Sequence, residues 1–359
     1  MNSEQERIVA ELQERSAGAP FVFFPDLYGK RSALKESADL AWACNGCVVL
    51  FYMTKTKNGE SKAVEHNLKQ ARRWLKDWRS GVQLTGKNAL RSFSIAHDQF
   101  PHTVILSVVN TDDAVMRFHY RETVNMGVTI CATVPEQLIH LLAQMRGSMV
   151  DLLLLLWGIG TRGECSKGWD AKMWVDDYLK FVHAEAAQFL RWPLTETDDA
   201  MKRALDAVYP LRVPHAGAIQ NVTDKDWVAA AVFNDMSLAN FLRTVYTIAS
   251  GVKTVEDSIA RGMPNAWIAD ARLDHMHLIV RIAPNVAILH KVYRESSIQI
   301  PEEPDAISAG RIEVFVSVDG APMILAVHGR TGLSQAERVL NDVALDRSTK
   351  GMSWGDPSS

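Results

Sequence analysis

The sequence predicts an α/β protein of three regions and a short tail, judged from where its strand-like and helix-like segments fall. Residues 1–163 alternate apolar runs of strand length with stretches of helical periodicity, which is typical of an α/β layer. Residues 164–263 carry mainly helical periodicity. Residues 264–346 return to strand-like runs, which predicts an α+β region with antiparallel strands, and residues 347–359 have the composition of a flexible tail.

The first region is expected to form a helix, a strand, a hairpin, a second helix and further strands. An apolar run between two prolines predicts the first strand, and Ser80–Gly81 marks the end of the second helix. The last helical stretch, opened by a proline, is either one long helix or two helices that meet at Gly147. The expected strands are 20–25, 39–44, 47–56, 102–110, 115–120 and 127–133, and the expected helices are 1–16, 61–81 and 135–157.

The hairpin has a register that the sequence itself predicts. Asn45–Gly46 between two apolar runs is the signature of a two-residue type I′ turn, which makes the flanking strands antiparallel neighbours. Counting outward from the turn pairs Cys44 with Cys47 and Asp39 with Tyr52. We therefore expect Asp39 and Lys55 to approach each other across the hairpin, with Tyr52 nearer to Asp39 than Lys55 is, unless a bulge shifts the register.

The two later regions are predicted from periodicity and turn residues. Helices are expected at 170–190, 197–209, 224–234 and 237–250, and strands at 267–273, 276–283, 286–293, 311–318 and 323–329. Pro284–Asn285 and Asp319–Gly320 predict turns between strands. A closing helix over 332–345 is indicated by Ser334 and Glu337, which fit a capping box.

Composition and charge restrict the classes of partner. The chain is 47% hydrophobic and 23% charged, which is ordinary for a soluble globular protein. Its net charge is -3, so any contact with nucleic acid must come from a local basic patch. The most apolar run, residues 149–160, falls short of the roughly 20 residues that span a bilayer, and Asp151 interrupts it. The N-terminus has no apolar signal-peptide core, so we expect a cytoplasmic protein with no membrane partner.

The hairpin also carries the residue types of a metal-dependent phosphodiesterase. Such enzymes gather carboxylates around Mg²⁺, which activates water and stabilises charge on the scissile phosphate, while a lysine assists. An acid on one strand and a Glu-x-Lys triplet on the next can meet on one face of a hairpin because alternate side chains share a face. Here Glu36 precedes the first expected strand, Asp39 begins it, and Lys55 lies near the end of the second.

This arrangement resembles the PD-(D/E)XK, or restriction-endonuclease-like, superfamily over about residues 21–75. The resemblance depends on Glu36-Ser-Ala-Asp39, on the apolar strand Val48–Phe51 and on the helical segment Gln70–Lys76. It implies that Asp39 and Glu36 are metal ligands for Mg²⁺ and that Lys55 and Gln70 assist catalysis.

The sequence departs from that pattern where the second acid belongs. In one register Tyr52 and Thr54 replace the Glu and Lys of the triplet, and in the other Met53 and Lys55 do. Neither register supplies a carboxylate, and Mg²⁺ selects oxygen donors and negative charge. Some members of the fold carry this acid on the next helix, where Glu65 is the candidate here. The catalytic candidates are therefore Glu36, Asp39, Lys55, Glu65 and Gln70.

A locally basic helix is the candidate nucleic-acid interface. Arg72, Arg73, Lys76 and Arg79 recur on adjacent turns, where they could meet the phosphates of DNA or RNA. The ordinary alternative is a solvated helix surface. In the same way, Glu36 and Asp39 have an ordinary interpretation as turn or capping residues, and both alternatives stay open at this point.

Two hypotheses of function follow. The first is a nucleic-acid-associated protein on a degenerate nuclease-like fold, with lost or weak phosphodiesterase activity, Mg²⁺ as its cofactor if active, and by family analogy alone a place in bacterial defence. The second is a non-enzymatic module that uses the same fold as a scaffold to bind another protein. The missing acid favours the second hypothesis, whereas the acid pair and the basic helix favour the first.

Overall fold

A computed structural model describes residues 3–30, 34–54, 60–110, 116–124, 127–162, 171–187, 199–212, 230–273, 276–298, 311–319, 324–328 and 336–340. The described residues form two compact units. The first unit contains the chain up to Leu179 together with residues 336–340, and the second contains 180–212 and 230–328. The α/β class is confirmed, and the region predicted to be separate and helical is divided between the two units. The predicted tail, 347–359, and Ser334 lie outside the described residues.

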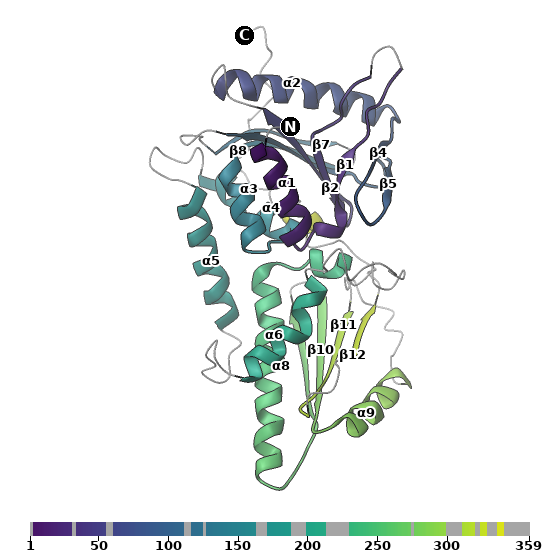
Figure 1. Ribbon diagram of the computed structural model, residues 1–359, viewed down its shortest axis with the longest axis vertical. Coiled ribbons are helices and arrows are strands. Elements are labelled where there is room, and N and C mark those ends of the chain that lie inside the picture. Colours follow the sequence, from purple (N-terminus) through teal and green to yellow (C-terminus); the bar gives the residue numbers. More distant parts are fainter. Residues whose placement is uncertain are drawn as a thin grey trace. The chain divides into compact units, whose positions relative to one another are not determined.

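The first unit is built on a mixed sheet whose strand order is β5-β4-β1-β2-β3-β6-β8-β7 (Figure 1). Strands β3, β6 and β8 are parallel to one another, and the other neighbouring pairs are antiparallel. The strands are β1 Val22–Pro25, β2 Leu40–Cys44, β3 Cys47–Thr54, β4 Leu84–Lys87, β5 Ser92–Ile95, β6 His102–Val109, β7 Arg117–Val124 and β8 Gly127–Pro135.

Helices cover both faces of this sheet. Helix α2 lies on one face, and α1, α3 and α4 lie on the other (Figure 1). Helices α3 and α4 are separate and flank Gly147, which decides between the two predicted arrangements. The helices of this unit are α1 Ser3–Arg15, α2 Glu60–Arg79, α3 Glu136–Gln144, α4 Met149–Arg162 and α5 Ala171–Ala187, with a 3₁₀ turn, η1, at Ala19–Phe21. The unit boundary falls within α5.

The β2–β3 hairpin has the predicted register. Cys44 pairs with Cys47 and Leu40 with Phe51, around a turn in which Asn45 and Gly46 have φ values of 53° and 76°. Positive φ at both central positions defines a type I′ turn. The sequence does not predict strands β4 and β5, because each has only four residues of mixed polarity.

Residues 336–340 belong to the first unit although they follow the second in sequence. They are helical, and Ala336, Val339 and Leu340 are buried. The Glu337 side chain lies against Gly46 so closely that a Cβ there would collide with its carboxyl group. The end of the described chain therefore packs beside the β2–β3 turn.

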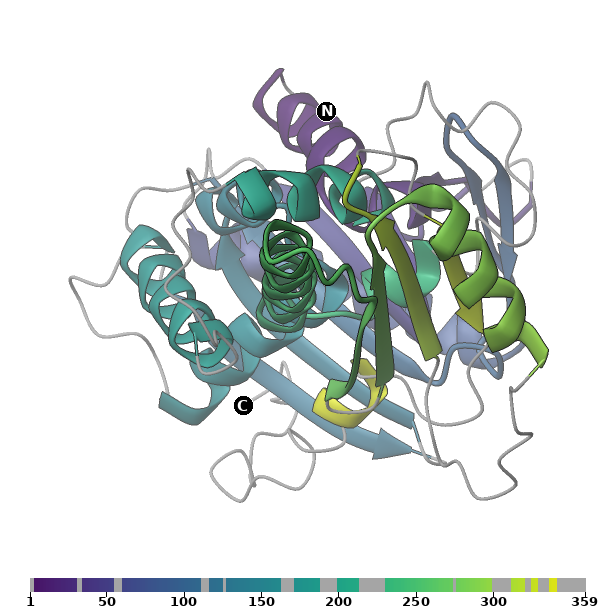
Figure 2. The same ribbon diagram turned by 90° about the horizontal axis from the view of Figure 1, so that it is seen from below.

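The second unit is a four-stranded sheet with helices on both faces. Its strand order is β12-β11-β10-β9. Figure 2 shows α8 nearly end-on beside one face of this sheet and α9 on the other. Its elements are α6 Asp199–Arg212, α8 Leu238–Ala260, β9 Trp267–Leu273, β10 Met276–Ala283, α9 Val286–Ile298, β11 Arg311–Ser317 and β12 Ile324–His328.

Two expectations for this unit are wrong. Strands β10 and β11 are parallel rather than antiparallel, and residues 286–293, predicted as a strand, begin helix α9. The two corrections have one cause, because parallel neighbours need a long crossover connection, usually a helix. Asn285, predicted as a turn residue, accepts a hydrogen bond from the Ile288 N–H (3.0 Å), as a helix-capping side chain does.

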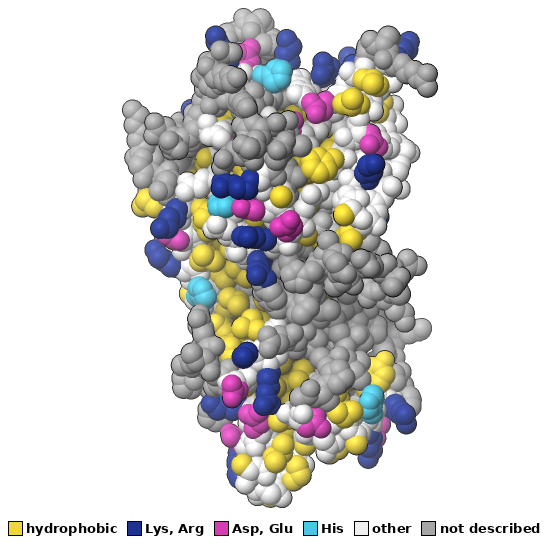
Figure 3. Space-filling model, viewed as in Figure 1, with side chains coloured by type: hydrophobic (Ala, Val, Ile, Leu, Met, Phe, Trp, Pro, Cys, Tyr) yellow, Lys and Arg dark blue, Asp and Glu magenta, His cyan; other side chains and the backbone are white. Residues whose placement is uncertain are grey.

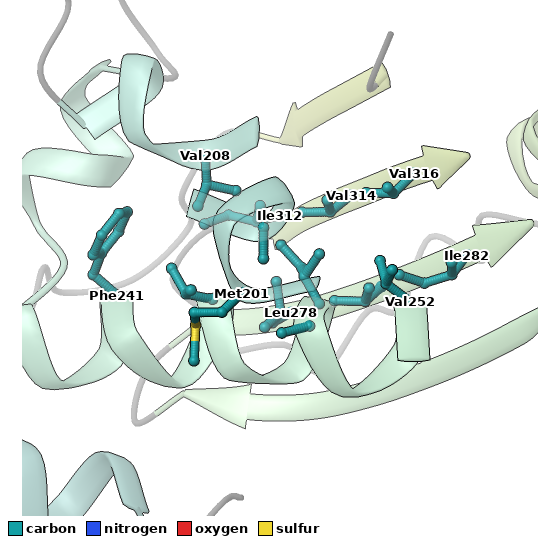
Figure 4. Packing of buried hydrophobic residues seen from close by; sticks show 14 of the residues in the cluster. Met201, Val208, Phe241, Val252, Leu278, Ile282, Ile312, Val314 and Val316 are labelled. Atoms are coloured by element: carbon teal, nitrogen blue, oxygen red, sulfur yellow. The ribbon is translucent and has the colours of Figure 1, made fainter. Parts of the chain in front are cut away.

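The core of the second unit lies between its helices and one face of the sheet (Figure 4). Alternate residues of β10 and β11 point toward α6 and α8, so that Leu278, Val314 and Val316 pack with Val208 and Val252. No helix among the described residues of either unit is long and apolar enough to cross a bilayer.

Candidate functional site

Asp39 lies across the hairpin from Tyr52, as the register predicts. Its backbone N–H donates to the Phe51 carbonyl (3.0 Å), and its Oδ2 accepts the N–H of Met53 (2.6 Å). The carboxyl group is therefore fixed at the start of β2 against the end of β3. Lys55, which the resemblance implies as its partner, lies outside the described residues.

The environment of Asp39 disfavours its charged form. Burial and, to a smaller extent, the charge of nearby Glu36 raise the pKa of this carboxyl to about 6, although the Met53 N–H and His66 oppose the shift. Glu36 itself is exposed. The structure thus brings Glu36 and Asp39 into one electrostatic neighbourhood, where they repel each other.

Tyr52, which one register of the hairpin aligns with the acid expected from the resemblance, is fully buried. Its hydroxyl donates to the Ser37 carbonyl (2.5 Å). Burial and the charge of Asp39 raise the pKa of Tyr52 well above its usual value, so the side chain stays a neutral phenol. A neutral, hydrogen-bonded phenol cannot act as the charged oxygen ligand that Mg²⁺ prefers.

Polar side chains cross the sheet at the level of Tyr52. Ser107 of β6 pairs with Tyr52, and Thr133 of β8 pairs with Ser107. The Asn67 amide of α2 donates to the Tyr52 carbonyl (3.0 Å) and to Ser107 Oγ (2.9 Å), while the His119 ring contacts Thr133 Oγ1 (2.5 Å). We call these five residues the polar row.

The polar row lies where this class of sheet commonly binds ligands. Tyr52, Ser107 and Thr133 each stand two residues before the carboxyl end of a parallel strand, beneath the N-terminal half of α2. Open α/β sheets commonly bind ligands beyond these strand ends. The sequence carries only a weak signal for the polar row. Each of two mainly apolar strands has one hydroxyl side chain near its end, Ser107 in β6 and Thr133 in β8.

Two further catalytic candidates, Glu65 and Gln70, lie on α2 and are separate from Asp39. Glu65 is exposed and Gln70 is half-buried. Within the described residues neither side chain makes a hydrogen bond or ion pair with Asp39. No three His, Cys, Asp or Glu side chains of that part of the chain form a group able to hold a metal ion.

The four basic residues predicted as one face have different environments. Arg79 forms an ion pair with Glu122 (2.9 Å) and donates to Thr129 Oγ1 (3.1 Å). Arg72 is half-buried near Cys131, where its charge opposes the rise in thiol pKa that burial causes. Arg73 and Lys76 are exposed, and the charge of Arg73 opposes the rise in the Tyr28 pKa that burial causes.

The loop that carries Glu36 is anchored to the same helix. Asp77 accepts hydrogen bonds from the Tyr28 hydroxyl (2.9 Å) and from Lys35 Nζ (3.1 Å). These two bonds lower the pKa of Asp77, because they stabilise its charged form. The loop is thereby joined to the last turns of α2, next to the start of β2.

The face of the first unit that carries α1 and α3 shows mixed charge. Figure 3 shows basic side chains interspersed with acidic ones and a histidine over these helices. Glu11 and His140 form an ion pair there, and Gln144 contacts the same ring. This face therefore offers less electrostatic attraction to a polyanion than the basic helix α2 on the other side of the sheet.

Comparison of the chain with protein-family models, with curated proteins and with solved structures finds no match. The role of the site is therefore inferred from its own residues.

The raised pKa of Asp39 predicts how stability depends on pH. An unfolded aspartate ionises near pH 4. Because the folded pKa of Asp39 is about 6, the folded state keeps the carboxyl proton over a pH range in which the unfolded state has lost it. The free energy of unfolding therefore falls as pH rises from about 4 to about 6. Asp39→Asn removes this loss of stability. At neutral pH we expect its free energy of unfolding to be higher than that of wild type by on the order of 2 kcal/mol, and near pH 4 we expect no gain. Urea unfolding of both proteins across this range measures the difference, and a pH-independent difference would contradict the assignment.

Proposed function

We propose that the first unit is a degenerate PD-(D/E)XK-like domain that associates with nucleic acid and has weak or no Mg²⁺-dependent phosphodiesterase activity. The order of its elements supports this proposal. Helix α1 precedes the antiparallel strands β1, β2 and β3, and α2 then leads through the β4–β5 hairpin to β6, which is parallel to β3. Asp39 stands at the start of β2, where the resemblance calls for an acid.

The single observation that carries the proposal is the position of Asp39. Its ionised form is disfavoured by burial and by Glu36, so the carboxylate lowers stability at neutral pH. Groups with such shifted pKa values concentrate at functional sites. The polar row beside it supplies further hydrogen-bonding groups at the same strand ends.

The residues present do not fit a catalytic Mg²⁺ site. Glu36 and Asp39 offer two carboxylates, but Asp39 already accepts the Met53 N–H, and the acid of the Glu-x-Lys triplet is missing, with Tyr52 in its place in one register. A lone ion needs a set of oxygen donors with near-octahedral geometry. Weak or absent cleavage follows from this incomplete set.

Cleavage and binding can be measured on the same preparation. The purified protein is incubated with labelled single-stranded and duplex DNA and RNA, with Mg²⁺ and with EDTA. We expect saturable binding and at most trace cleavage, with Asp39→Asn changing neither the fold nor the background hydrolysis. Strong Mg²⁺-dependent cleavage that Asp39→Asn abolishes would contradict the proposal. If Glu65→Gln also abolishes it, the second acid has moved to α2.

A second candidate function is a protein-interaction module. It is favoured by the ion pair between Arg79 and Glu122, which removes one of the four predicted basic contacts. Leu27 and Leu34, in the loop between β1 and β2, are also exposed. Absence of any affinity for nucleic acid at low salt would leave this candidate as the better one.

A further inference from the structure

The solvent face of α2 carries basic side chains in a single line. Lys62, His66, Lys69, Arg73 and Lys76 are all exposed and recur at intervals of four, three, four and three residues. At 3.6 residues per turn this spacing places them along one side of the helix. We call these five residues the cationic line.

The packing of α2 fixes where this line points. Ala63, Asn67, Ala71, Trp74 and Trp78 of the same helix are buried, and all but Ala63 contact the sheet or its core side chains. The cationic line lies on the other side of the helix, so it faces solvent along its whole length.

The line has a local excess of positive charge. Helix α2 contains six basic and three acidic residues, whereas the whole chain has a net charge of -3. No acidic residue belongs to the line. Asp77 is already bound by Tyr28 and Lys35, and Glu65 is the acidic side chain exposed beside it.

The charges of the line are largely unused within the protein. Among the described residues no ion pair is made by Lys62, Lys69, Arg73 or Lys76. Exposed lysines that are not paired can exchange bound counterions for phosphates at little cost.

We propose that the cationic line binds the sugar–phosphate backbone of nucleic acid, which rests on the nucleic-acid association proposed above. From Lys62 to Lys76 the helix rises about 21 Å. Over that length one strand of duplex DNA presents about six phosphates, so regularly spaced charges on the two molecules can pair in several registers. Contacts of this kind carry no sequence information.

A lipid surface fits the line less well. Membrane-surface helices bury an apolar face in the headgroup region, and the apolar face of α2 is already covered by the sheet. An acidic protein remains a distinct outcome, which the experiment separates from nucleic acid.

This surface differs from the one that the sequence predicts. Arg73 and Lys76 are common to both. Arg79 is bound to Glu122 and Arg72 leans toward β8, so neither belongs to the line. Lys62 and Lys69, which lie beyond that predicted set, take their place.

The test compares two triple variants with equal loss of charge. The first is Lys62→Gln, Lys69→Gln and Lys76→Gln. The control is Lys172→Gln, Lys202→Gln and Lys291→Gln, which are exposed lysines on other helices. Fluorescence anisotropy of a labelled single strand and a labelled duplex across a salt series gives Kd and its salt dependence.

The first variant is expected to bind at least tenfold more weakly at low salt. Its plot of log Kd against log salt should be flatter by about one unit per lost lysine. The control should keep wild-type affinity and slope, and both variants should keep the wild-type melting temperature because all six side chains are exposed.

Three results overturn the proposal in distinguishable ways. If wild type binds and both variants bind equally well, the line is wrong and the nucleic-acid function stands. If wild type binds neither probe, the function proposed above falls as well. If polyglutamate competes as well as nucleic acid of equal charge, the partner of the line is an acidic polypeptide.

Discussion

Replacing Asp151 by alanine is expected to lower the free energy of unfolding by about 3 kcal/mol. Asp151 is fully buried near the start of α4, in the most apolar run of the chain. Its Oδ2 accepts hydrogen bonds from the Ser148 N–H (2.6 Å) and Ser148 Oγ (2.9 Å), and its Oδ1 accepts the Tyr178 hydroxyl (2.6 Å). Alanine leaves these donors buried without their acceptor.

Tyr178→Phe is the matched control for this prediction. It removes one of the hydrogen bonds and keeps the ring, so we expect a loss of about 1 kcal/mol. Urea unfolding followed by circular dichroism gives both values. A loss below about 1 kcal/mol for Asp151→Ala would mean that the carboxylate contributes little to joining α4 with α5.

Gly18→Ala is expected to destabilise the first unit by about 3 kcal/mol, at the upper end of the usual cost of overpacking. The added Cβ would overlap the indole ring of Trp42, a fully buried side chain of β2. Gly18 itself has an ordinary φ of -88°, so the loss comes from packing and not from backbone strain.

Gly81→Ala separates these two causes. Gly81 has a φ of 102°, and no atom lies within 4 Å of the position that an alanine Cβ would take. Its substitution therefore costs backbone strain alone, about 1 kcal/mol. Thermal melts of the two variants should differ clearly, and equal losses would show that Trp42 can move aside.

Local sequence signals predict the hairpin and place the alternative break in the third long helical stretch at Gly147. Asn45–Gly46 determines the turn type through φ, and the turn then determines which residues pair, from Cys44 with Cys47 to Leu40 with Phe51. Gly147 marks the break between α3 and α4 in the same local way. These features depend on residues that are close in sequence.

The remaining features depend on distant residues. Ser107 and Thr133 join the polar row only because β3, β6 and β8 align in parallel, and no local pattern gives that register. The segment that forms α9 resembles a strand because a short apolar run has no decisive period. The sequence alone indicates that Arg79 is available to bind phosphate, because its ion-pair partner Glu122 lies on β7, far away in sequence.

The packing of residues 336–340 beside Gly46 makes the first unit discontinuous along the chain. During synthesis from the N-terminus, the β2–β3 turn leaves the ribosome long before Glu337 does, with the whole second unit made in between. Until residues 336–340 are made, the nascent first unit lacks the segment that packs against Gly46, next to His102. A chain truncated before residue 336 lacks the segment that packs against Gly46, although Gly46 lies far from the truncation in sequence.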